Sequence, residues 1–445
     1  MDSDAAELRP KLEGVLATVL GAGTAVEQLR TLTGGASRTT WAFDAVTGGR
    51  RRPLILRTGP PDDVHAGMEL EAQAQAAAAA AGAPVPHILV ADNSPAALGN
   101  PFLICDEIKG ETIARRIQRR LDAADGHAAR AHLLGQCAHA VAAIHRAEID
   151  RIQDPGLRRQ DQLTEWRQRL DDMGDTTATF EWAFRWLAAR RPRAAPAVLA
   201  HGDFRMGNLI VDGAQLAAVL DWELVHVGQA YEDLAWFCIR AWRFGAPAGF
   251  GAGGLGSIES FLRAYEQASA TTVDRAAFHW WLVLATLRWG GDLPLPGGAA
   301  PERPAPLGRA GHHRPARLRD RVGSAQPARR GRLMIGPYGR PLAAELVAAV
   351  AEFLETDVRA ATEGQVNFHA RVAANALRIV ERELLDESEA ESRAALAALG
   401  FADEEQLAAA IRAGEMDGRA DDVIACLRAL VRRRLAVAHP GYDNE

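Results

Sequence analysis

The chain has 445 residues, of which 24% are charged, and a formal net charge of -6 at pH 7. This length allows two or three domains with sizeable cores, and the net charge gives no general reason to expect nucleic acids or acidic membranes as partners. No apolar run reaches the roughly 18 residues that a membrane span needs, and no secretory leader opens the chain. The four cysteines lack the spacing of a metal site and predict buried thiols in a reducing compartment, so we expect a cytoplasmic protein.

A turn of small residues is the first informative feature. Residues 33–40 contain Gly34, Gly35 and Ser37 and precede a stretch of alternating polarity at 41–45. A plain hairpin turn uses these residue types, but such a turn also lets backbone amides approach phosphate oxygens closely. From the residues alone, both interpretations stay open.

Two strands and a helix are predicted next. Residues 53–57 form an apolar strand that ends in the cation Arg57, and an Ala-rich helix carrying Glu71 follows. Residues 101–108 predict a buried strand that becomes polar at Asp106.

A predicted hairpin follows the loop His-Gly-Asp-x4-Asn at 201–208. Two short apolar segments, 209–211 and 216–220, flank Asp212-Gly213, which is a strong hairpin turn signal. Pairing of these segments returns Asp221, which follows the second one, to the side of Asn208, which precedes the first.

The polar residues around this hairpin have the types that phosphoryl transfer requires. That reaction needs a carboxylate to orient and deprotonate the attacking hydroxyl, together with oxygen ligands for magnesium. Asp203 supplies the first, while the amide of Asn208 and the carboxylate of Asp221 suit a hard cation. Singly, the three residues are also compatible with a turn cap, a strand start and a loop; their order around a hairpin favours a phosphoryl-transfer centre.

The pattern His-Gly-Asp-x4-Asn, followed by Asp-Trp-Glu at 221–223, resembles the catalytic and metal-binding loops of the aminoglycoside phosphotransferase family. The resemblance runs from about residue 30 to residue 289 and implies an α+β, two-lobed protein-kinase-like fold with a small mixed β-sheet lobe and a large helical lobe. It further implies that Asp203 is the catalytic base, that Asn208 and Asp221 bind Mg2+, and that His201 buttresses the loop.

Two more residues are expected near this loop. Asp233 matches a family position that braces the catalytic loop from the next helix, and an ordinary acidic first turn of a helix is the alternative. His145 lies on a helix expected to pack beneath the loop, where we predict a hydrogen-bonded core histidine rather than a ligand.

The resemblance also implies an ATP site in the N-terminal part, with the turn that contains Gly34, Gly35 and Ser37 against the phosphates. Arg57 stands where kinases usually place a lysine that pairs with the phosphates. Lysine occurs only at positions 11 and 109 of the whole chain, so arginine must fill this position. Arginine keeps the charge and can bind phosphate through two nitrogens, although its geometry differs from that of lysine.

Glu71 is the predicted ion-pair partner of Arg57, and a solvated surface carboxylate is the alternative. In the family, the segment equivalent to residues 101–108 joins the two lobes, and its backbone meets the adenine edge. The resemblance therefore assigns Asp106 and Ile108 to the nucleotide site as linker residues.

The sequence argues against an aminoglycoside acceptor. Residues 271–290 contain only Asp274 as an acidic residue, whereas the acceptor sites of aminoglycoside-modifying members are rich in carboxylates. The Asp-Trp-Glu form and Arg57 look more like the branch of kinase-like domains associated with acyl-CoA dehydrogenases, which implies a hydroxyacyl-CoA or a similar metabolite as the acceptor.

The composition changes abruptly at residues 291–333. Of these 43 residues, 30 are Gly, Pro, Arg or Ala, and nine arginines stand against three acids. A disordered linker or a tail that binds nucleic acid is one interpretation. We favour a frameshifted translation of a GC-rich gene, because reading such a gene out of frame yields mostly these four residues; peptides from this segment would decide the matter.

Helical periodicity returns at residue 334. Apolar spacing predicts one helix at 341–354, a second around 372–384 and three shorter ones through about residue 437. This part resembles an uncharacterised helical family that accompanies such phosphotransferases. A polar group on the second helix is predicted to form a solvated or inter-helix face rather than a site; its members are Asn367, His369, Arg371, Asn375 and Arg378.

We therefore predict an N-lobe at 1–108 that binds nucleotide, a C-lobe at 109–290 that holds the catalytic and acceptor sites, a linker at 291–333 and a helical accessory domain at 334–445. The predicted activity is ATP-dependent phosphoryl transfer to a hydroxyl of a small molecule, with ATP and Mg2+ as cofactors. The alternative is a pseudokinase or scaffold that binds nucleotide and a protein partner, the latter through 334–445. We expect no membrane partner, and nucleic acid only if the basic segment is functional.

Overall fold

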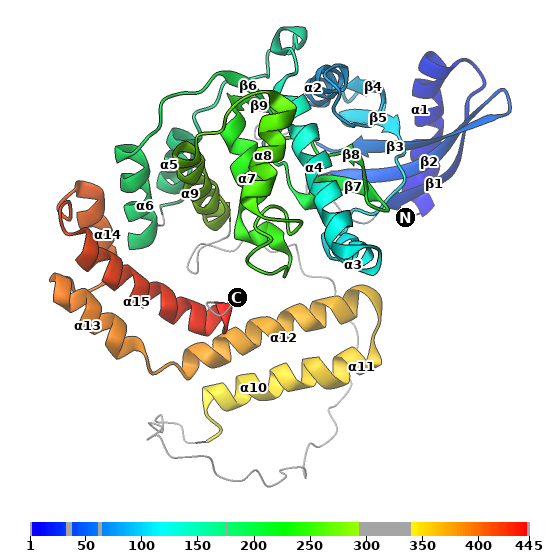
Figure 1. Cartoon of the computed structure of the whole chain (residues 1–445). Helices are drawn as coiled ribbons and strands as arrows, with labels where there is room; N and C mark the ends of the chain where they lie inside the picture. Colours follow the sequence, from blue (N-terminus) through cyan, green and yellow to red (C-terminus); the bar gives the residue numbers. More distant parts are fainter. Residues whose placement is uncertain (1, 33–37, 61–64, 175, 293–339, 443–445) are drawn as a thin grey trace. The chain divides into compact units, whose positions relative to one another are not determined.

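The computed structural model describes residues 2–32, 38–60, 65–174, 176–292 and 340–442 (Figure 1). It divides into two compact units. The larger unit comprises Met1–Gly174 and Ala183–Pro294, and the smaller unit comprises Asp175–Trp182 and Leu295–Glu445. Among the described helices, none combines the length and the apolar character that crossing a membrane requires.

A five-stranded sheet forms the N-terminal part of the larger unit, with strand order β1-β2-β3-β5-β4. A mixed sheet was expected, but all four strand pairs are antiparallel. Its strands are β1 (Ala25–Leu32), β2 (Thr39–Thr47), β3 (Arg50–Thr58), β4 (Ile88–Asp92) and β5 (Phe102–Asp106), accompanied by helices α1 (Asp2–Leu20) and α2 (Met68–Ala80). Strands were predicted at 53–57 and 101–108. The first is confirmed within β3, whereas β5 covers only residues 102–106, so the second prediction extended too far toward residue 108.

Side-chain alternation decides what each face of this sheet contacts. Leu54 and Leu56 of β3 pack with Leu12 and Leu16 of α1, whereas Ile55, between them in the chain, packs with Met68 of α2. Arg57 is two residues beyond Ile55 and therefore shares the α2 face. This alternation directs a cation of β3 toward the first turns of α2.

The rest of the larger unit is mainly helical. Its helices are α3 (Ala114–Ala123), α4 (Gly126–His145), α5 (Gln162–Met173), α6 (Ala178–Ala189), α7 (Ala230–Cys238), α8 (Ile258–Ser269) and α9 (Arg275–Asp292), and the first residues of α6 are grouped with the smaller unit. Two short ladders lie among these helices: β6 (Ala197–Ala200) pairs with β9 (His226–Gln229), and β7 (Leu209–Asp212) pairs with β8 (Gln215–Val219). The predicted hairpin around Asp212-Gly213 is thus confirmed.

The smaller unit is helical in the residues that the structure describes. It contains α10 (Ala343–Phe353), η4 (Leu354–Val358), α11 (Arg359–Ala361), α12 (Gly364–Leu384), α13 (Glu389–Leu399), α14 (Glu404–Ala413) and α15 (Ala420–Ala438). The predicted order of helices is confirmed, but α15 has 19 residues, so the expectation that all three last helices are shorter was wrong.

The polar group on α12 includes two clear inter-helix contacts. The Asn367 amide donates to the carbonyls of Arg359 and Thr362, and Arg378 forms an ion pair with Glu355 at 2.7 Å. The interpretation of this group as an inter-helix face is confirmed for these two residues. The predicted linker at 291–333 lies almost entirely outside the described residues.

Candidate active site

The loop after β6 has a conformation that depends on a glycine. Gly202 has φ = +83°, and a Cβ there would lie 2.3 Å from the carbonyl oxygen of Leu224. His201, beside it, donates from Nε2 to the carbonyl of Leu220 at 3.0 Å, while its Nδ1 accepts from the amide of Asp203 at 3.2 Å. His201 thus ties the loop to the residue that follows β8, a contact of the buttressing kind that the family resemblance implies.

Asp233, in the first turn of α7, braces the same loop. Its carboxylate accepts from the backbone amides of His201 and Gly202, at 2.8 and 2.9 Å, and from Nε2 of His145 at 3.1 Å. Burial alone would raise the pKa of Asp233, but the hydrogen bond and charge of His145, with the contacts to His201, lower it to about 2. His145 also bonds the Tyr265 hydroxyl at 2.9 Å, so the prediction of a hydrogen-bonded core histidine is confirmed.

The carboxylate of Asp203 is held from three sides. Nδ2 of Asn208 donates to it at 2.7 Å, Nε1 of Trp236 at 2.6 Å and Nε of Arg205 at 3.0 Å. Because the amide nitrogen of Asn208 is used here, its amide oxygen is the atom available to a cation. The side chain of Asp203 remains partly accessible, as a group that receives a proton must be.

The β7–β8 hairpin returns the chain to the side of this loop. The amide of Leu220 donates to the carbonyl of Asn208 at 2.8 Å, so Asp221 emerges next to the end of the catalytic loop. Asp221 has φ = +66°, a conformation that non-glycine residues rarely adopt and that is typical of functional positions. One oxygen of its carboxylate accepts from Arg57 at 2.8 Å.

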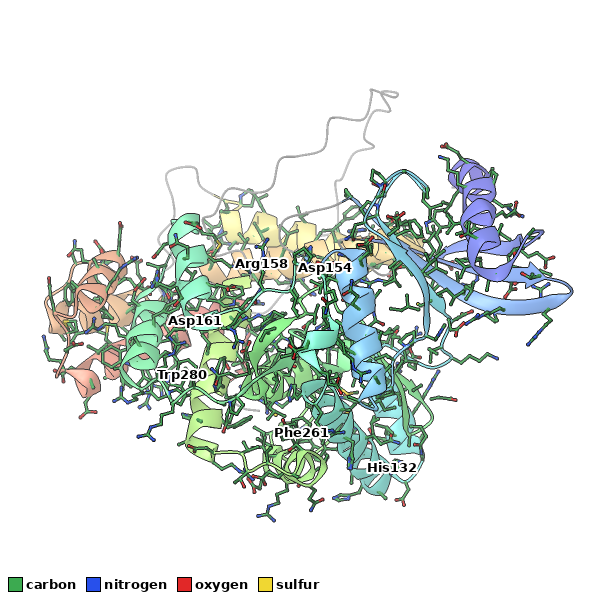
Figure 2. The ribbon with its side chains drawn as sticks, turned by 90° about the horizontal axis from the view of Figure 1, so that it is seen from above. His132, Asp154, Arg158, Asp161, Phe261 and Trp280 are labelled. Atoms are coloured by element: carbon green, nitrogen blue, oxygen red, sulfur yellow. The ribbon has the colours of Figure 1, made fainter. Side chains whose placement is uncertain are left out.

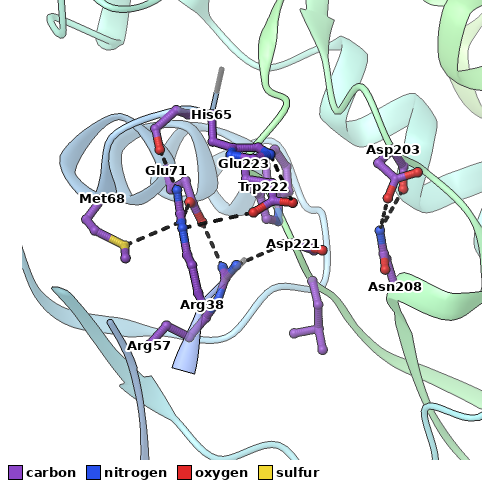
Figure 3. Close-up of polar contacts among 12 residues, drawn as sticks. Arg38, Arg57, His65, Met68, Glu71, Asp203, Asn208, Asp221, Trp222 and Glu223 are labelled. Carbon is purple, nitrogen blue, oxygen red and sulfur yellow. Dashed lines mark hydrogen bonds and ion pairs between the residues drawn. The ribbon is translucent and has the colours of Figure 1, made fainter. Parts of the chain in front are cut away.

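Two arginines share one buried glutamate beside Asp221 (Figure 3). The Glu71 carboxylate is fully buried; one oxygen accepts from Arg57 at 2.8 Å, and the other accepts from Arg38. The predicted Arg57–Glu71 ion pair is therefore confirmed, and the solvated alternative is wrong. Burial opposes the charge on Arg57, yet the carboxylates of Glu71 and Asp221 raise its pKa above the usual value.

Glu223 extends this network through contacts with Arg38 and His65. Its carboxylate lies 4.0 Å from Nε of Arg38 and 3.8 Å from Nε2 of His65. Burial and the neighbouring Asp221 charge raise the pKa of Glu223. Asp221 and Glu223 thus connect Arg57 and Arg38 of the N-terminal part to the hairpin that follows the catalytic loop.

The remaining predicted residues fall into two groups. The carboxylate of Asp106 forms an ion pair with Arg52 at 2.7 Å, and Ile108 is half-buried after β5, so neither side chain joins the network of Arg57. Gly34, Gly35 and Ser37 lie outside the described residues.

No group of three or more His, Cys, Asp or Glu side chains within the described ranges is arranged to hold a metal. This finding is compatible with magnesium, which keeps several waters and uses one or two protein oxygens together with substrate phosphates. The amide oxygen of Asn208 and the second carboxylate oxygen of Asp221 are oxygen donors of that type.

A pocket of about 530 Å³ lies beside the catalytic loop. Gly202 and residues 223–226 form part of its wall. The remaining lining comes from residues 65–70, from residues 156–169 and from Arg288 of α9. Its volume falls in the range of small-molecule sites, which is about 300–1,000 Å³.

Comparison with known families decides the classification. Residues 28–281, more than half of the chain, match the model of the phosphotransferase enzyme family. The chain belongs to this family. Membership makes the phosphotransferase a small-molecule kinase by class. Residues 360–442 match a second model, described only as a domain of unknown function (DUF6285).

Two curated relatives are named as acyl-CoA dehydrogenases. The phosphotransferase is 43% identical over 61 residues to acyl-CoA dehydrogenase family member 10 of Mus musculus, a match that covers 13% of this chain and 6% of the relative. It is 25% identical over 229 residues to probable acyl-CoA dehydrogenase IBR3 of Arabidopsis thaliana, covering 46% of this chain and 27% of the relative. The chain spans less than a third of either relative's length.

Solved structures show the fold. A crystal structure of a candidate aminoglycoside phosphotransferase from Ralstonia eutropha JMP134 matches with a TM-score of 0.52 and 22% identity, covering 64% of this chain and 86% of that one. The predicted kinase-like α+β fold is thereby confirmed for the phosphotransferase, as is the resemblance to the branch associated with acyl-CoA dehydrogenases.

Sequence reasoning missed Arg38 and Trp236. Arg38 precedes Thr40 by two residues, and Thr40 pairs with Arg57 across β2 and β3, so the strand period places Arg38 on the same face as Arg57. That signal was present in the sequence once the register was known. The contact of Trp236 with Asp203 also had a signal, because Trp236 lies three residues after Asp233, on the face of α7 that was predicted to brace the catalytic loop.

Proposed function

We propose that this phosphotransferase transfers the γ-phosphoryl group of ATP to a hydroxyl of a small molecule. The observation that carries the proposal is the placement of Asp203, Asn208 and Asp221 around one hairpin, with Arg57 reaching Asp221 from the N-terminal sheet. A base, two oxygen ligands and a phosphate-binding cation are the groups that this reaction requires.

Asp203 is the proposed base. The acceptor oxygen attacks the γ-phosphorus, the bond to the β–γ bridging oxygen breaks, ADP leaves, and the hydroxyl proton passes to the Asp203 carboxylate. The hydrogen bonds from Asn208 and Trp236, at 2.7 and 2.6 Å, fix the direction of that carboxylate. Positioning of this kind provides most of the catalysis that a protein contributes to phosphoryl transfer.

The amide oxygen of Asn208 and the carboxylate of Asp221 would hold Mg2+. When bound, the ion neutralises charge on the phosphate oxygens. Arg57 would shift from Asp221 toward the phosphates while Glu71 continues to orient it, because its two terminal nitrogens contact the two carboxylates separately.

The remaining nucleotide contacts follow from the family resemblance. The turn with Gly34, Gly35 and Ser37 would supply backbone amides to the phosphates. The linker at Asp106 and Ile108 would meet adenine through its backbone, since the Asp106 side chain is already paired with Arg52.

The proposed acceptor is a hydroxyacyl-CoA or a similar hydroxylated metabolite. The names of the curated relatives support an acyl-CoA, and the scarcity of acidic residues at 271–290 argues against an aminoglycoside. Residues 334–445 are proposed as an accessory domain, which includes the segment that matches the family of unknown function.

Transfer of label from γ-labelled ATP to a panel of hydroxylated metabolites and acyl-CoAs tests this proposal. We expect magnesium-dependent transfer by the wild type and its loss in Asp203→Asn. Asp212→Asn is the matched control, because Asp212 is an exposed residue of the adjacent hairpin, outside the proposed machinery. Nucleotide binding without transfer to any acceptor would favour the scaffold alternative instead.

A further inference from the structure

The pocket beside the catalytic loop is rich in arginine. Arg158 and Arg159 come from the segment before α5, Arg169 from α5 and Arg288 from α9. Two carboxylates, Glu165 and Glu223, are the acidic members of the lining. Four guanidinium groups against two carboxylates give the pocket an excess of positive charge, although the chain as a whole is acidic.

Two of these arginines are well placed to receive an anion. Arg158 and Arg159 are exposed to solvent, and within the described part of the chain their guanidinium groups form no ion pair. Figure 2 shows Arg158 on the segment between Asp154 and Asp161. Glu223, by contrast, already faces Arg38 and His65, so its charge is partly matched before any ligand enters.

The backbone that carries these arginines is fixed. The amide of Val227 in β9 donates to the carbonyl of Arg158 at 2.9 Å, and the amide of Gln160 donates to the carbonyl of Val227 at 3.2 Å. This pairing holds the segment against β9, a few residues beyond Glu223. Arginines on a fixed segment lose less freedom on binding than arginines on a mobile one.

The pocket is also connected to the catalytic carboxylate. The Arg288 guanidinium lies over the Trp236 ring, with 4.3 Å to the centroid, and Nε1 of Trp236 donates to Asp203 at 2.6 Å. Gly202 of the pocket wall is the chain neighbour of Asp203. The pocket wall therefore adjoins the loop that carries Asp203, although Asp203 itself is not one of the lining residues.

We propose that this pocket binds the anionic group of the acceptor, a carboxylate or a phosphate, through Arg158 and Arg159 with support from Arg169. The inference rests on the proposed function, in which the same molecule presents a hydroxyl to Asp203. Guanidinium groups bind planar or tetrahedral oxyanions through paired N–H donors, which matches this chemistry and disfavours a cationic aminoglycoside.

The first test is direct binding without nucleotide. Trp166 lies in the pocket wall, and the Arg169 guanidinium lies over its ring, 4.9 Å from the ring centroid. Trp166 fluorescence therefore reports on ligand binding in the pocket. The probes are 3-hydroxybutyrate, its uncharged methyl ester and 3-hydroxybutyryl-CoA. Binding of the free acid assigns the pocket to a carboxylate, binding of the CoA thioester alone assigns it to a phosphate, and equal binding of the methyl ester overturns the inference.

The second test removes the charges. We expect Arg158→Gln/Arg159→Gln to weaken binding of the anionic probe, and to raise its KM in the transfer assay, by roughly tenfold or more, since a hydrogen bond to a charged group contributes that much. Arg158→Lys/Arg159→Lys should retain part of the affinity. Arg119→Gln, on the exposed face of α3, is the matched control.

The outcomes separate the two proposals. Phosphoryl transfer that is as efficient in the double Gln variant as in Arg119→Gln would overturn the anion site while leaving the proposed function intact. Arginine-dependent binding of the anion by a wild-type protein that transfers no phosphate would support the anion site and contradict the proposed function.

Discussion

Replacing Glu71 with glutamine tests whether the buried network between the sheet and Asp221 stabilises the larger unit. The glutamate is fully buried, and its partners Arg38 and Arg57 have side chains only 9% and 19% exposed. Glutamine preserves the shape but removes the negative charge. The amide N–H2 group of the glutamine would also face one of the two guanidinium groups. A guanidinium has no acceptor atom, so no hydrogen bond can form there.

The loss of stability in Glu71→Gln depends on which carboxylates remain in contact with each arginine. Arg57 retains Asp221 at 2.8 Å, whereas the nearest carboxylate remaining to Arg38 is Glu223 at 4.0 Å. Breaking a buried ion pair by removing one partner costs about 3–5 kcal/mol, and the retained contact of Arg57 places Glu71→Gln near the lower end of that range. For a domain of this size the unfolding midpoint should fall by about 6–10 °C.

Tryptophan fluorescence during thermal unfolding is the assay, because nine of the ten tryptophans belong to the larger unit. Glu259→Gln is the matched control: Glu259 also bridges two arginines, Arg263 and Arg275, but it is exposed on α8. We expect little change in the midpoint from the control. A Glu71→Gln midpoint no lower than that of Glu259→Gln would refute the reasoning that burial gives this network its strength.

Three further predictions concern the catalytic loop and its cation. Gly202→Ala should lower the free energy of unfolding by about 3 kcal/mol, because the new Cβ would clash with a backbone oxygen at a residue with positive φ. Gly213→Ala is the control: its Cβ would enter open space, so we expect a loss of only about 1 kcal/mol. Chemical denaturation measures both. Because the pKa of Asp233 is lowered in the folded protein, its carboxylate adds to the free energy of unfolding in full above about pH 4, and this contribution is lost as the pH falls toward about 2. Acid titration of the wild type should show this loss of stability, and Asp233→Asn should show a smaller dependence of stability on pH. Arg57→Lys keeps the charge but cannot contact Glu71 and Asp221 through two nitrogens, so steady-state kinetics should show the KM for ATP raised roughly tenfold; an unchanged KM would contradict the assigned role.

Local signals made the centre of the site predictable. The hairpin depends on Asp212-Gly213 and on two apolar segments that adjoin it, so its pairing could be inferred from a few neighbouring residues. Once the hairpin forms, Asn208 and Asp221 must approach each other. The strand period similarly directs Arg57 toward α2, where Glu71 lies in the first turn.

Other contacts that join distant segments were not predicted. Arg38 reaches Glu71 only because of the register between β2 and β3 and the placement of α2. Trp236 reaches Asp203 because α7 packs against the loop through Asp233. The arginine-lined pocket gathers residues from 156–169 and from α9, which are more than a hundred positions apart, so no local pattern indicates it.

The family resemblance added what the residues alone left open. The backbone amides of His201 and Gly202 donate hydrogen bonds to the Asp233 carboxylate, which favours a loop brace over an ordinary helix start. The pocket that we propose for the acceptor is lined by four arginines and two glutamates, unlike the acidic type expected of aminoglycoside-modifying members, and these side chains lie outside the shared motifs.

The most direct test of the central claim compares wild type and Asp203→Asn in a single turnover with ATP, magnesium and an acceptor identified by the label-transfer screen. Nucleotide affinity is measured on the same samples. The assignment of Asp203 as the base predicts unchanged nucleotide affinity, with phosphoryl transfer slowed by about a hundredfold or more. Transfer by Asp203→Asn at a rate close to that of the wild type would contradict it.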